Sequence, residues 1–465
     1  MSPLFAAAQE IDRPKPQPQE IDSFVESGME QLKTPATAIA FFENGEITHM
    51  NGFGRIDGTD APVTAQTPFQ IGSVSKSFTS LVVLQLADEG RLSIDDPVVK
   101  HIPYFQTRDP KVSSGVTIRH LMNHVSGIAT LDGNRYQATT YRGEDATELA
   151  VRRLRNAQLK ATPGELYQYS NANYATLAHL IETIEHKPFE KVIEARIFTP
   201  LGMKNSFVQT PDKLVQTPAR GHLKIFGHPV EKHFIAGRMM MGAGGITASA
   251  EDLATYLLAL SENDPRVTPS ALAKTWAKKW TSGYEFGWEY NQNGQERIIH
   301  HGGLNPGFRA MVMYVPEKGT GGVVLTNQSG SFEGNLPWGS LEYALGLKLN
   351  GIKPPKPERD RFKMIVSSTL ILALGCILSV YRLYKTRSKP RHRRSIVRWS
   401  ELLFPTLILG GIAFILYHIV PRLSHVTFPA VGLFYPDLGF LLTIQIATCL
   451  VWMVTRFWLL ISRPI

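Results

Sequence analysis

The pattern of hydrophobic and polar positions divides the chain into a long mixed region and a strongly apolar carboxy-terminal region. Three apolar runs, at about 364–383, 402–420 and 438–454, each approach the ~20 residues needed to cross a bilayer core. Trp, Tyr and Arg residues near their ends are typical of membrane–water interfaces. We therefore expect three transmembrane helices within 363–465, with buried helices of a soluble domain as the alternative.

The mixed region opens with a helix pattern followed by strand patterns. Apolar periodicity predicts a helix at 21–32 and a strand at 37–42, and Asn44-Gly45 between apolar runs predicts a hairpin leading into a second strand. From Lys76 onward, apolar residues recur at helical spacing until Gly90 ends the helix.

Helix and strand patterns continue through the rest of this region. Helical patterns start near Glu144 and at 175–184, and after Gly283 the strand-like segments are 286–290, 298–300, 309–315 and 321–326. Strands at both ends with helices between them predict an α+β domain whose sheet pairs early strands with late ones. The expected organisation is a signal-peptide remnant with a flexible segment (1–24), this domain (25–350), a Pro/Lys-rich linker (351–362) and the three-helix transmembrane region (363–465).

Charge is distributed unevenly along the chain. From Arg361 onward there are 13 Lys and Arg against 2 Asp and Glu, so the tail carries +11 and the remainder −2 of the net charge of +9. A near-neutral body with a basic, apolar tail indicates a membrane rather than nucleic acid as partner. Between the first two apolar runs, residues 382–398 include eight basic and no acidic side chains. This loop is therefore predicted to be cytoplasmic, and the amino-terminal domain extracytoplasmic.

An exported amino-terminal domain needs an export signal. The chain opens Met1-Ser-Pro-Leu-Phe-Ala-Ala-Ala, which has the small-residue end of a signal peptide but neither a basic start nor a long enough apolar core. We expect the translation start to lie upstream of Met1, with Ala6–Ala8 as the remnant of a cleavage site. A genome without in-frame apolar codons upstream would contradict this.

Ser73 and Lys76 are the first candidates for chemistry. The domain has no cysteine, because Cys376 and Cys449 both lie in the apolar tail, so a thiol nucleophile is excluded there. A serine hydroxyl needs a base, and Lys76 lies one helical turn after Ser73 on the same face. Burial or a neighbouring cation can lower the pKa of a lysine far enough for this role. On its own the spacing is common, and a solvated lysine on a helix is the plainer interpretation.

Two further motifs carry groups suited to the same chemistry. In Tyr169-Ser170-Asn171, the tyrosine hydroxyl can relay a proton and the Asn171 amide can bind a substrate carbonyl. In isolation, a buried aromatic residue beside a helix cap is the favoured interpretation of this motif. In His300-His301-Gly302-Gly303-Leu304, glycines let a substrate approach the strand edge, and a strand N–H can complete an oxyanion hole.

In this order, the three motifs resemble the serine β-lactamase and penicillin-binding-protein-like hydrolases, in particular the class C β-lactamase-like branch. The resemblance covers about 25–345 and includes Glu89–Pro97, Leu121–Gly127, Pro163-Gly164, Pro200–Met203, Ala243–Ile246 and Phe286–Trp288. It implies an α+β fold, with an antiparallel sheet flanked by helices and a helical subdomain.

The resemblance also implies a role for each matching residue. The nucleophile, base and proton relay would be Ser73, Lys76 and Tyr169, the substrate contacts Asn171, His301 and Gly303, and the oxyanion-hole N–H groups those of Ser73 and Leu304. The family motif allows His300 or His301, and counting back from Pro306-Gly307-Phe308 favours His301. Since this histidine replaces the lysine of true β-lactamases, and a neutral imidazole binds a carboxylate weakly, penicillin hydrolysis is a poor candidate.

No metal or other cofactor is expected. His120 and His124 have the i, i+4 spacing of a metal-binding pair, but no third ligand is in view. A structural turn within the Leu121–Gly127 segment is the favoured interpretation of this pair.

The predicted function is that of a membrane-anchored, extracytoplasmic serine hydrolase that works through an acyl-enzyme on a peptide or acyl-peptide. The three-helix tail and the His301–Pro306 run resemble peptidases that remove an N-acyl-D-asparagine leader from nonribosomal-peptide prodrugs, which carry a serine where this chain has Asn171. The alternatives are a D-Ala-D-Ala carboxypeptidase or D-amino-acid peptidase, an esterase of the same fold, and a catalytically inactive membrane sensor. The oligomeric state is not predicted.

Overall fold

The computed structural model divides the chain into two units, Met1–Pro357 and Glu358–Ile465. The boundary falls within the predicted linker, 351–362, most of which lies outside the described residues. The structure describes 17–56, 60–135, 137, 139–210, 219–232, 234, 237–278, 282–293, 295–330, 345–346, 348, 360–385, 407–419, 425 and 427–461. The predicted cleavage remnant, Ala6–Ala8, lies outside these ranges.

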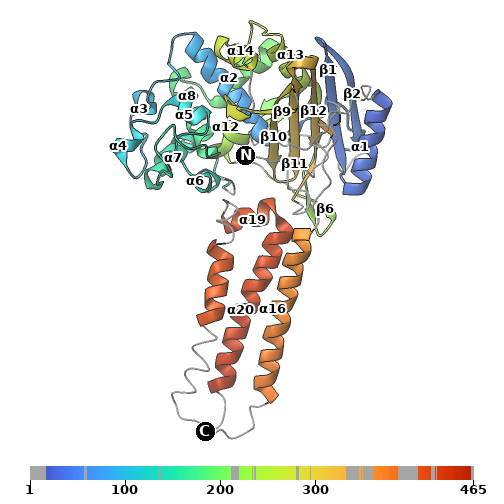
Figure 1. The fold of residues 1–465 in the computed structure, drawn as a ribbon, viewed down its shortest axis with the longest axis vertical. Coiled ribbons are helices and arrows are strands. Elements are labelled where there is room, and N and C mark those ends of the chain that lie inside the picture. The colour runs from blue at the N-terminus through green and yellow to red at the C-terminus, as the bar shows by residue number, and fades with distance from the viewer. Residues whose placement is uncertain are drawn as a thin grey trace. The chain divides into compact units, whose positions relative to one another are not determined.

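A seven-stranded antiparallel sheet forms one side of the first unit (Figure 1). Its strands, in spatial order, are β2 (Glu46–Gly54), β1 (Ala36–Glu43), β12 (Thr320–Thr326), β11 (Phe308–Val315), β10 (Glu296–Asn305), β9 (Trp288–Asn293) and β8 (Gly283–Glu285). The prediction that early strands pair with late ones is confirmed, because β1 lies between β2 and β12. Asn44 and Gly45 connect β1 to β2 with φ of 49° and 88°, as the hairpin prediction requires.

Two small three-stranded sheets accompany the large one. The first has the order β3 (Phe69–Gln70), β7 (Ile246–Ala248) and β4 (Phe207–Val208), and leads into the segment that holds Ser73. The second has the order β13 (Gln328–Ser329), β5 (His222–Ile225) and β6 (His228–Glu231).

Helices fill the chain between the early and late strands. The longer ones are α1 (Pro18–Leu32), α2 (Ser75–Asp88), α8 (Asn171–Glu185), α13 (Ala250–Ser261) and α14 (Ser270–Ala277). The shorter ones are α3 (Val98–His101), α4 (Pro110–Ser113), α5 (Ile118–Met122), α6 (Thr130–Asn134), α7 (Ala146–Arg152), α9 (Phe189–Ile193), α10 (Thr199–Leu201) and α12 (Met241–Gly244). Single turns of other helix types are η2 (Gly72–Val74), η3 (Arg153–Asn156), η4 (Glu194–Phe198), η5 (Arg238–Met240) and η6 (Pro316–Lys318).

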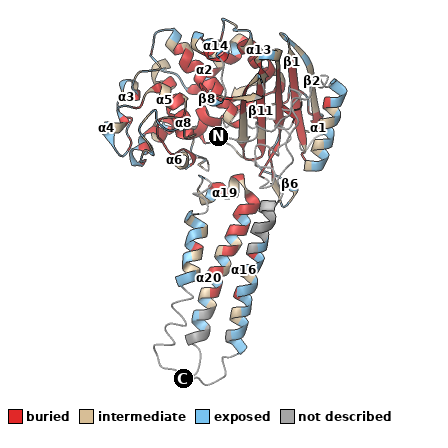
Figure 2. Cartoon of the chain, in the orientation of Figure 1, coloured by how far each residue is buried: buried red, intermediate tan, exposed pale blue. Residues whose placement is uncertain are grey.

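The main core lies between the sheet and the helices α2, α8 and α13. Ala38 and Ala40 of β1 and Leu325 of β12 face this core, whereas Ile39 of β1 packs on the other face against Val25 of α1. This alternation follows from the two-residue period of a strand. Almost every residue of α2 is buried, and Figure 2 shows α2 and α8 largely in the buried colour. These two helices therefore form a rigid support for the residues at their amino-terminal ends.

The second unit is helical where it is described. It contains α16 (Asp360–Lys385), a helical segment at 407–419 that includes η8 (Ile415–Ile419), α19 (Phe428–Phe434) and α20 (Pro436–Ile461). Within the described residues one stretch, Pro436–Thr455, is long and apolar enough to cross a membrane, and Thr369–Arg382 and Leu407–Ile419 are shorter apolar helices. Gln445 Nε2 of α20 donates a 2.6 Å hydrogen bond to Thr369 Oγ1 of α16, and Cys376 and Cys449 are buried free thiols.

Candidate active site

Ser73 lies in the short turn η2 that joins β3 to α2. Its neighbours Gly72 and Val74 are buried, while Ser73 itself is partly exposed. Gly72 has a φ of 50°, and a Cβ atom there would lie 2.5 Å from the amide nitrogen of Leu304. Only glycine fits this position, because a side chain would meet backbone atoms of β10.

Lys76 is buried completely behind Ser73. Its Nζ lies 2.9 Å from Ser73 Oγ and donates a 2.7 Å hydrogen bond to the carbonyl oxygen of Ala243. Burial lowers the pKa of Lys76 well below its ordinary value, and the Glu289 carboxylate opposes this effect. A lysine whose charged form is disfavoured by burial therefore lies within hydrogen-bond distance of the partly exposed Ser73 hydroxyl, as the three-residue spacing predicts.

Aromatic rings surround the Lys76 amine. Lys76 Nζ lies 4.9 Å from the centre of the Tyr169 ring and 5.7 Å from that of Tyr174. Burial raises the pKa of Tyr169 well above its ordinary value, and a hydrogen bond with the Ser73 side chain partly opposes this. Tyr169 thus lies beside both Ser73 and Lys76 with its hydroxyl protonated.

The two histidines of β10 have different surroundings. His301 Nε2 lies 3.3 Å from the Tyr284 hydroxyl, and its Nδ1 lies 2.7 Å from the carbonyl oxygen of Gly302. Burial, followed by the charge of Lys76, lowers the pKa of His301 to about 3. His300 instead pairs with Asn291 of β9, whose Nδ2 lies 2.6 Å from His300 Nε2. His301 is therefore the histidine of the Lys76 cluster, and it is neutral.

The end of β10 lies against η2. β9 pairs with β10 only as far as His300, so among the described strands the following residues of β10 have no partner on that side. A Cβ on Gly303 would lie 1.9 Å from the carbonyl oxygen of Ile71, which shows how closely the two backbones approach. The amide nitrogen of Leu304 is thereby placed next to the Gly72-Ser73 segment.

Asn171 begins α8 and is buried. Its Nδ2 donates a 2.8 Å hydrogen bond to Asn134 Oδ1 of α6, while its Oδ1 has no hydrogen-bond partner within the described part of the chain. The other predicted site residues adjoin Ser73 or Lys76, whereas the described contacts of Asn171 are with α6.

Sequence reasoning missed three members of the cluster around Lys76. Tyr284 of β8 packs against Tyr169 and His301, His124 packs against Tyr169, and Glu289 of β9 lies directly across from Tyr284 in the sheet. His124 lies in the Leu121–Gly127 segment, and Tyr284 and Glu289 lie close to the Phe286–Trp288 segment. The sequence alone does not reveal the roles of these two segments.

His120 and His124 each use Nδ1 to accept a hydrogen bond from a backbone amide. His120 Nδ1 accepts a hydrogen bond from the Thr117 amide, whereas His124 Nδ1 accepts one from the Ser170 amide. Among the residues that the structure describes, no group of three or more His, Cys, Asp or Glu side chains could hold a metal ion.

Comparison with known proteins identifies the family. The sequence model of the family described as Beta-lactamase matches residues 21–343. The chain belongs to the beta-lactamase family. Protein flp of Staphylococcus aureus strain N315 is 28% identical to this family member over 413 residues, covering 86% of this chain and 82% of that protein. Penicillin-binding protein 4 of Amycolatopsis lactamdurans is 29% identical over 316 residues, covering 63% of this chain and 81% of that protein.

Solved structures share the fold of this beta-lactamase family member. The octameric penicillin-binding protein homologue from Pyrococcus abyssi matches with a TM-score of 0.61 and 27% identity, covering 73% of this chain and 78% of that one. The penicillin-binding protein from Bacillus halodurans matches with a TM-score of 0.56 and 23% identity, covering 66% of this chain and 95% of that one. The predicted α+β fold with its antiparallel sheet is thus confirmed.

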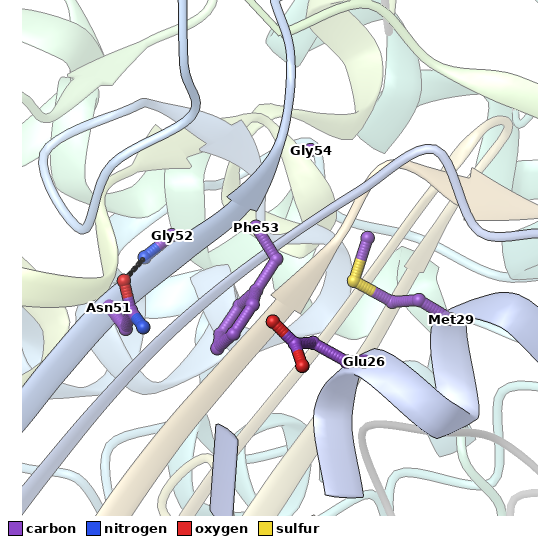
Figure 3. A pocket seen from close by; sticks show the side chains of 6 residues that line it. All are labelled: Glu26, Met29, Asn51, Gly52, Phe53 and Gly54. Atoms are coloured by element: carbon purple, nitrogen blue, oxygen red, sulfur yellow. Dashed lines mark hydrogen bonds between the residues drawn. The ribbon is translucent and has the colours of Figure 1, made fainter. Parts of the chain in front are cut away.

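A surface pocket lies elsewhere in the first unit. It has a volume of about 400 Å³ between α1 and β2 and is lined by Glu26, Met29, Asn51, Gly52, Phe53 and Gly54 (Figure 3). Asn51 Oδ1 accepts a 2.8 Å hydrogen bond from the Gly52 amide there. None of these residues belongs to the Ser73 cluster, and β2 is the strand of the sheet farthest in order from β8.

Proposed function

We propose that the chain is a membrane-anchored, extracytoplasmic serine hydrolase that forms a covalent acyl-enzyme on Ser73. The observation that supports this best is the 2.9 Å contact between the partly exposed Ser73 Oγ and the buried Lys76 Nζ. Burial lowers the pKa of Lys76 well below its ordinary value, which favours the neutral amine, and the lone pair of that amine can accept the serine proton.

The acylation step follows from these positions. Ser73 Oγ attacks the substrate carbonyl carbon while its proton passes to Lys76, and the carbonyl oxygen becomes an anion. The amides of Ser73 and Leu304 stabilise this anion, as the contact between η2 and β10 allows. The intermediate then collapses: the bond from the carbonyl carbon to the leaving nitrogen or oxygen breaks, Tyr169, protonated in the resting site, gives its proton to the departing amine or alcohol, and Lys76 returns a proton to Tyr169. Water then attacks the acyl-enzyme by the reverse path and releases the acid.

The substrate class we propose is a peptide containing D-amino acids or an N-acyl-D-amino-acid prodrug. A neutral His301 supplies no permanent positive charge for a β-lactam carboxylate, which disfavours penicillins. His301, Gly303 and Asn171 would contact the substrate. Asn171 Oδ1, which has no hydrogen-bond partner among the described residues, could accept a hydrogen bond from a substrate N–H group. The competing candidate is a D-Ala-D-Ala carboxypeptidase, favoured by the similarity to penicillin-binding protein 4.

The membrane anchor is proposed to comprise three helices, with the hydrolase unit outside the cell membrane. The apolar helix Pro436–Thr455 and the two shorter apolar helices support this, as does the basic segment at 382–398. Because the first unit comprises 357 of 465 residues, about 77%, an alignment covering 86% of the chain with protein flp extends into the second unit. The apolar unit is therefore shared, at least in part, with that relative.

A fluorophosphonate probe tests the nucleophile directly. The folded full-length chain should be labelled at Ser73, and a Ser73→Ala variant should not. An unlabelled Ser73 in folded protein would favour the inactive sensor. The substrate class is tested by offering acyl-D-Asn amides, D-Ala-D-Ala peptides and short-chain esters side by side. Turnover of D-Ala-D-Ala peptides alone would support the carboxypeptidase, and turnover of esters alone would exclude a peptidase.

A further inference from the structure

His124 contacts the chain on both sides of Tyr169. It follows α5 with a φ of 56° and is completely buried. Its carbonyl oxygen accepts a 2.7 Å hydrogen bond from the amide of Gln168, and its Nδ1 accepts a 3.2 Å hydrogen bond from the amide of Ser170. Gln168 and Ser170 are the residues immediately before and after Tyr169.

The protonation state of His124 follows from its partners. The Ser170 amide can only donate, so Nδ1 must be an acceptor without a proton. Asn173 Oδ1 accepts a hydrogen bond from Ser126 Oγ at 2.8 Å, which turns Asn173 Nδ2 toward His124 Nδ1 at 3.0 Å. With two donors on Nδ1, the single ring proton lies on Nε2. A second ring proton would lie on Nδ1 and point at both of these donor groups, so the imidazole stays neutral.

The ring of His124 packs directly on the aromatic cluster. Its centre lies 4.3 Å from that of Tyr169 and 4.7 Å from that of Tyr284. Nε2 is buried and has no hydrogen-bond partner among the described residues, so the ring edge that bears it contributes packing rather than a hydrogen bond. Burial, and then the charges of Lys76 and His301, lower the pKa of His124 well below its ordinary value, consistent with the neutral form.

We propose that His124 is a positioning residue that fixes the Tyr169 hydroxyl beside Ser73 and Lys76. Its backbone oxygen and Nδ1 hold the two residues that flank Tyr169, and its ring limits the rotation of the tyrosine ring. His124 exchanges no proton with substrate and acts only through Tyr169. The inference rests on the proposed function, because the role of His124 is defined by its effect on the proton relay through Tyr169.

Two substitutions separate the hydrogen bonds of His124 from its bulk. His124→Phe keeps a flat ring but removes the acceptor, whereas His124→Asn places an amide oxygen near the Nδ1 position and tolerates a positive φ. A misplacement of a catalytic group by about 1 Å costs on the order of 100-fold in rate. We therefore expect His124→Phe to lower kcat for a short-chain alkyl ester, whose alcohol leaving group needs a proton, by roughly 10- to 100-fold with little change in KM. His124→Asn should recover most of that loss.

A double substitution tests whether His124 acts through Tyr169. Tyr169→Phe removes the hydroxyl, so adding His124→Phe to it should lower kcat by less than about twofold more. A combined loss equal to the product of the two separate losses would overturn the proposal, as would wild-type kcat in His124→Phe. His179→Phe is the matched control, because His179 is also buried, between Tyr104 and Thr147. It should lower the unfolding temperature and leave kcat unchanged.

Failure of this inference is distinguishable from failure of the proposed function. If the wild-type chain is neither labelled by fluorophosphonate nor active on any substrate, the proposed hydrolase function fails. If the wild type is active and the His124 variants match it, only the positioning role fails. Where His124→Phe does not fold, Asn173→Ala replaces it, since this variant removes one of the two donors to Nδ1 and leaves the ring in place. Asn173→Ala is then expected to lower kcat by less than His124→Phe would, and to have little further effect when it is added to Tyr169→Phe. An unchanged kcat in Asn173→Ala overturns the proposal.

Discussion

The amide nitrogen of Leu304 lies 2.5 Å from the position that a Cβ atom would occupy on Gly72. The backbone of η2 and that of β10 therefore touch at this point, immediately before Ser73. We propose that the amides of Ser73 and Leu304 bind the oxyanion. The distance between these two amides depends on the absence of a side chain at residue 72.

Gly72→Ala should consequently separate η2 from β10 and reduce kcat by about 100-fold or more, the usual effect of losing an oxyanion-hole donor. Gly90→Ala is the matched control, because Gly90 also has a positive φ, of 71°, but nothing lies within 4 Å of its Cβ position. Both variants should lose stability through backbone strain. Equal kcat losses for the two variants, measured alongside thermal unfolding, would contradict this assignment.

Ser73→Ala should abolish turnover and leave the fold intact, because the hydroxyl contributes little packing. Loss of a catalytic nucleophile lowers kcat by about 10³-fold or more. Lys76→Met should be nearly as damaging, and it retains the buried stem of Lys76 so that no large cavity forms. Circular dichroism and thermal unfolding establish that the variants fold. Near-native kcat in Lys76→Met would show that another group is the base.

The positions of Ser73 and Lys76 were predictable because residues three apart in this turn and helix must be neighbours. The motif favoured His301 over His300 as a site residue, which stays a prediction, and the neutral state of His301 depends on burial that the motif does not reveal. The strand and helix patterns also predicted an α+β domain whose sheet pairs early strands with late ones, and the family resemblance implied that the sheet is antiparallel. The neighbourhood of Ser73 and Lys76, by contrast, is determined by spacing alone.

Other relationships depended on long-range packing. The sequence predicts a strand at 286–290, but Phe286 and Gly287 have φ of 52° and 84° and form the turn between β8 and β9. That turn packs on α2, since a Cβ on Gly287 would lie 2.8 Å from Ser77 Cα. Glu289 is thereby carried toward Lys76. A bulky residue with positive φ gives no local signal for a turn, so the sequence did not reveal Glu289.

Stability should decrease as the pH falls from about 6.5 to about 4, because His300 is buried in its neutral form. Burial lowers the pKa of His300 from 6.5 to about 4, so the unfolded chain binds this proton at a higher pH than the folded chain does. Protonation thus favours unfolding within that window, and the difference corresponds to roughly 3 kcal/mol.

Urea denaturation of the full chain at pH 7 and pH 4.5 measures this loss of stability. His300→Gln should reduce the difference between the two pH values, whereas His228→Gln, on the exposed end of β6, should leave it unchanged. An identical pH dependence in the wild type and His300→Gln would show that His300 is not the group responsible.

Glu289→Gln should move the acidic limb of the pH–rate profile to lower pH. The base must be neutral to accept the Ser73 proton, so the rate rises as the pH passes upward through the pKa of Lys76. The Glu289 carboxylate raises that pKa, and burial raises the pKa of Glu289 itself to about 7. Because the two groups titrate as a coupled pair, an uncharged glutamine leaves Lys76 neutral down to a lower pH.

The matched control for Glu289→Gln is Glu285→Gln. Glu285 is a buried carboxyl at the end of β8, and it interacts with Lys278 and Arg119 rather than with Lys76. The acidic limb of the Glu285→Gln pH–rate profile should coincide with that of the wild type. The measurement is kcat/KM for a neutral ester between pH 5 and pH 9, so that the charge of the substrate does not change. A limb that stays in place or moves to higher pH in Glu289→Gln would mean that the neutral form of Lys76 does not limit the reaction. Lys76 would then serve as a cation that orients Ser73, with the proton accepted elsewhere.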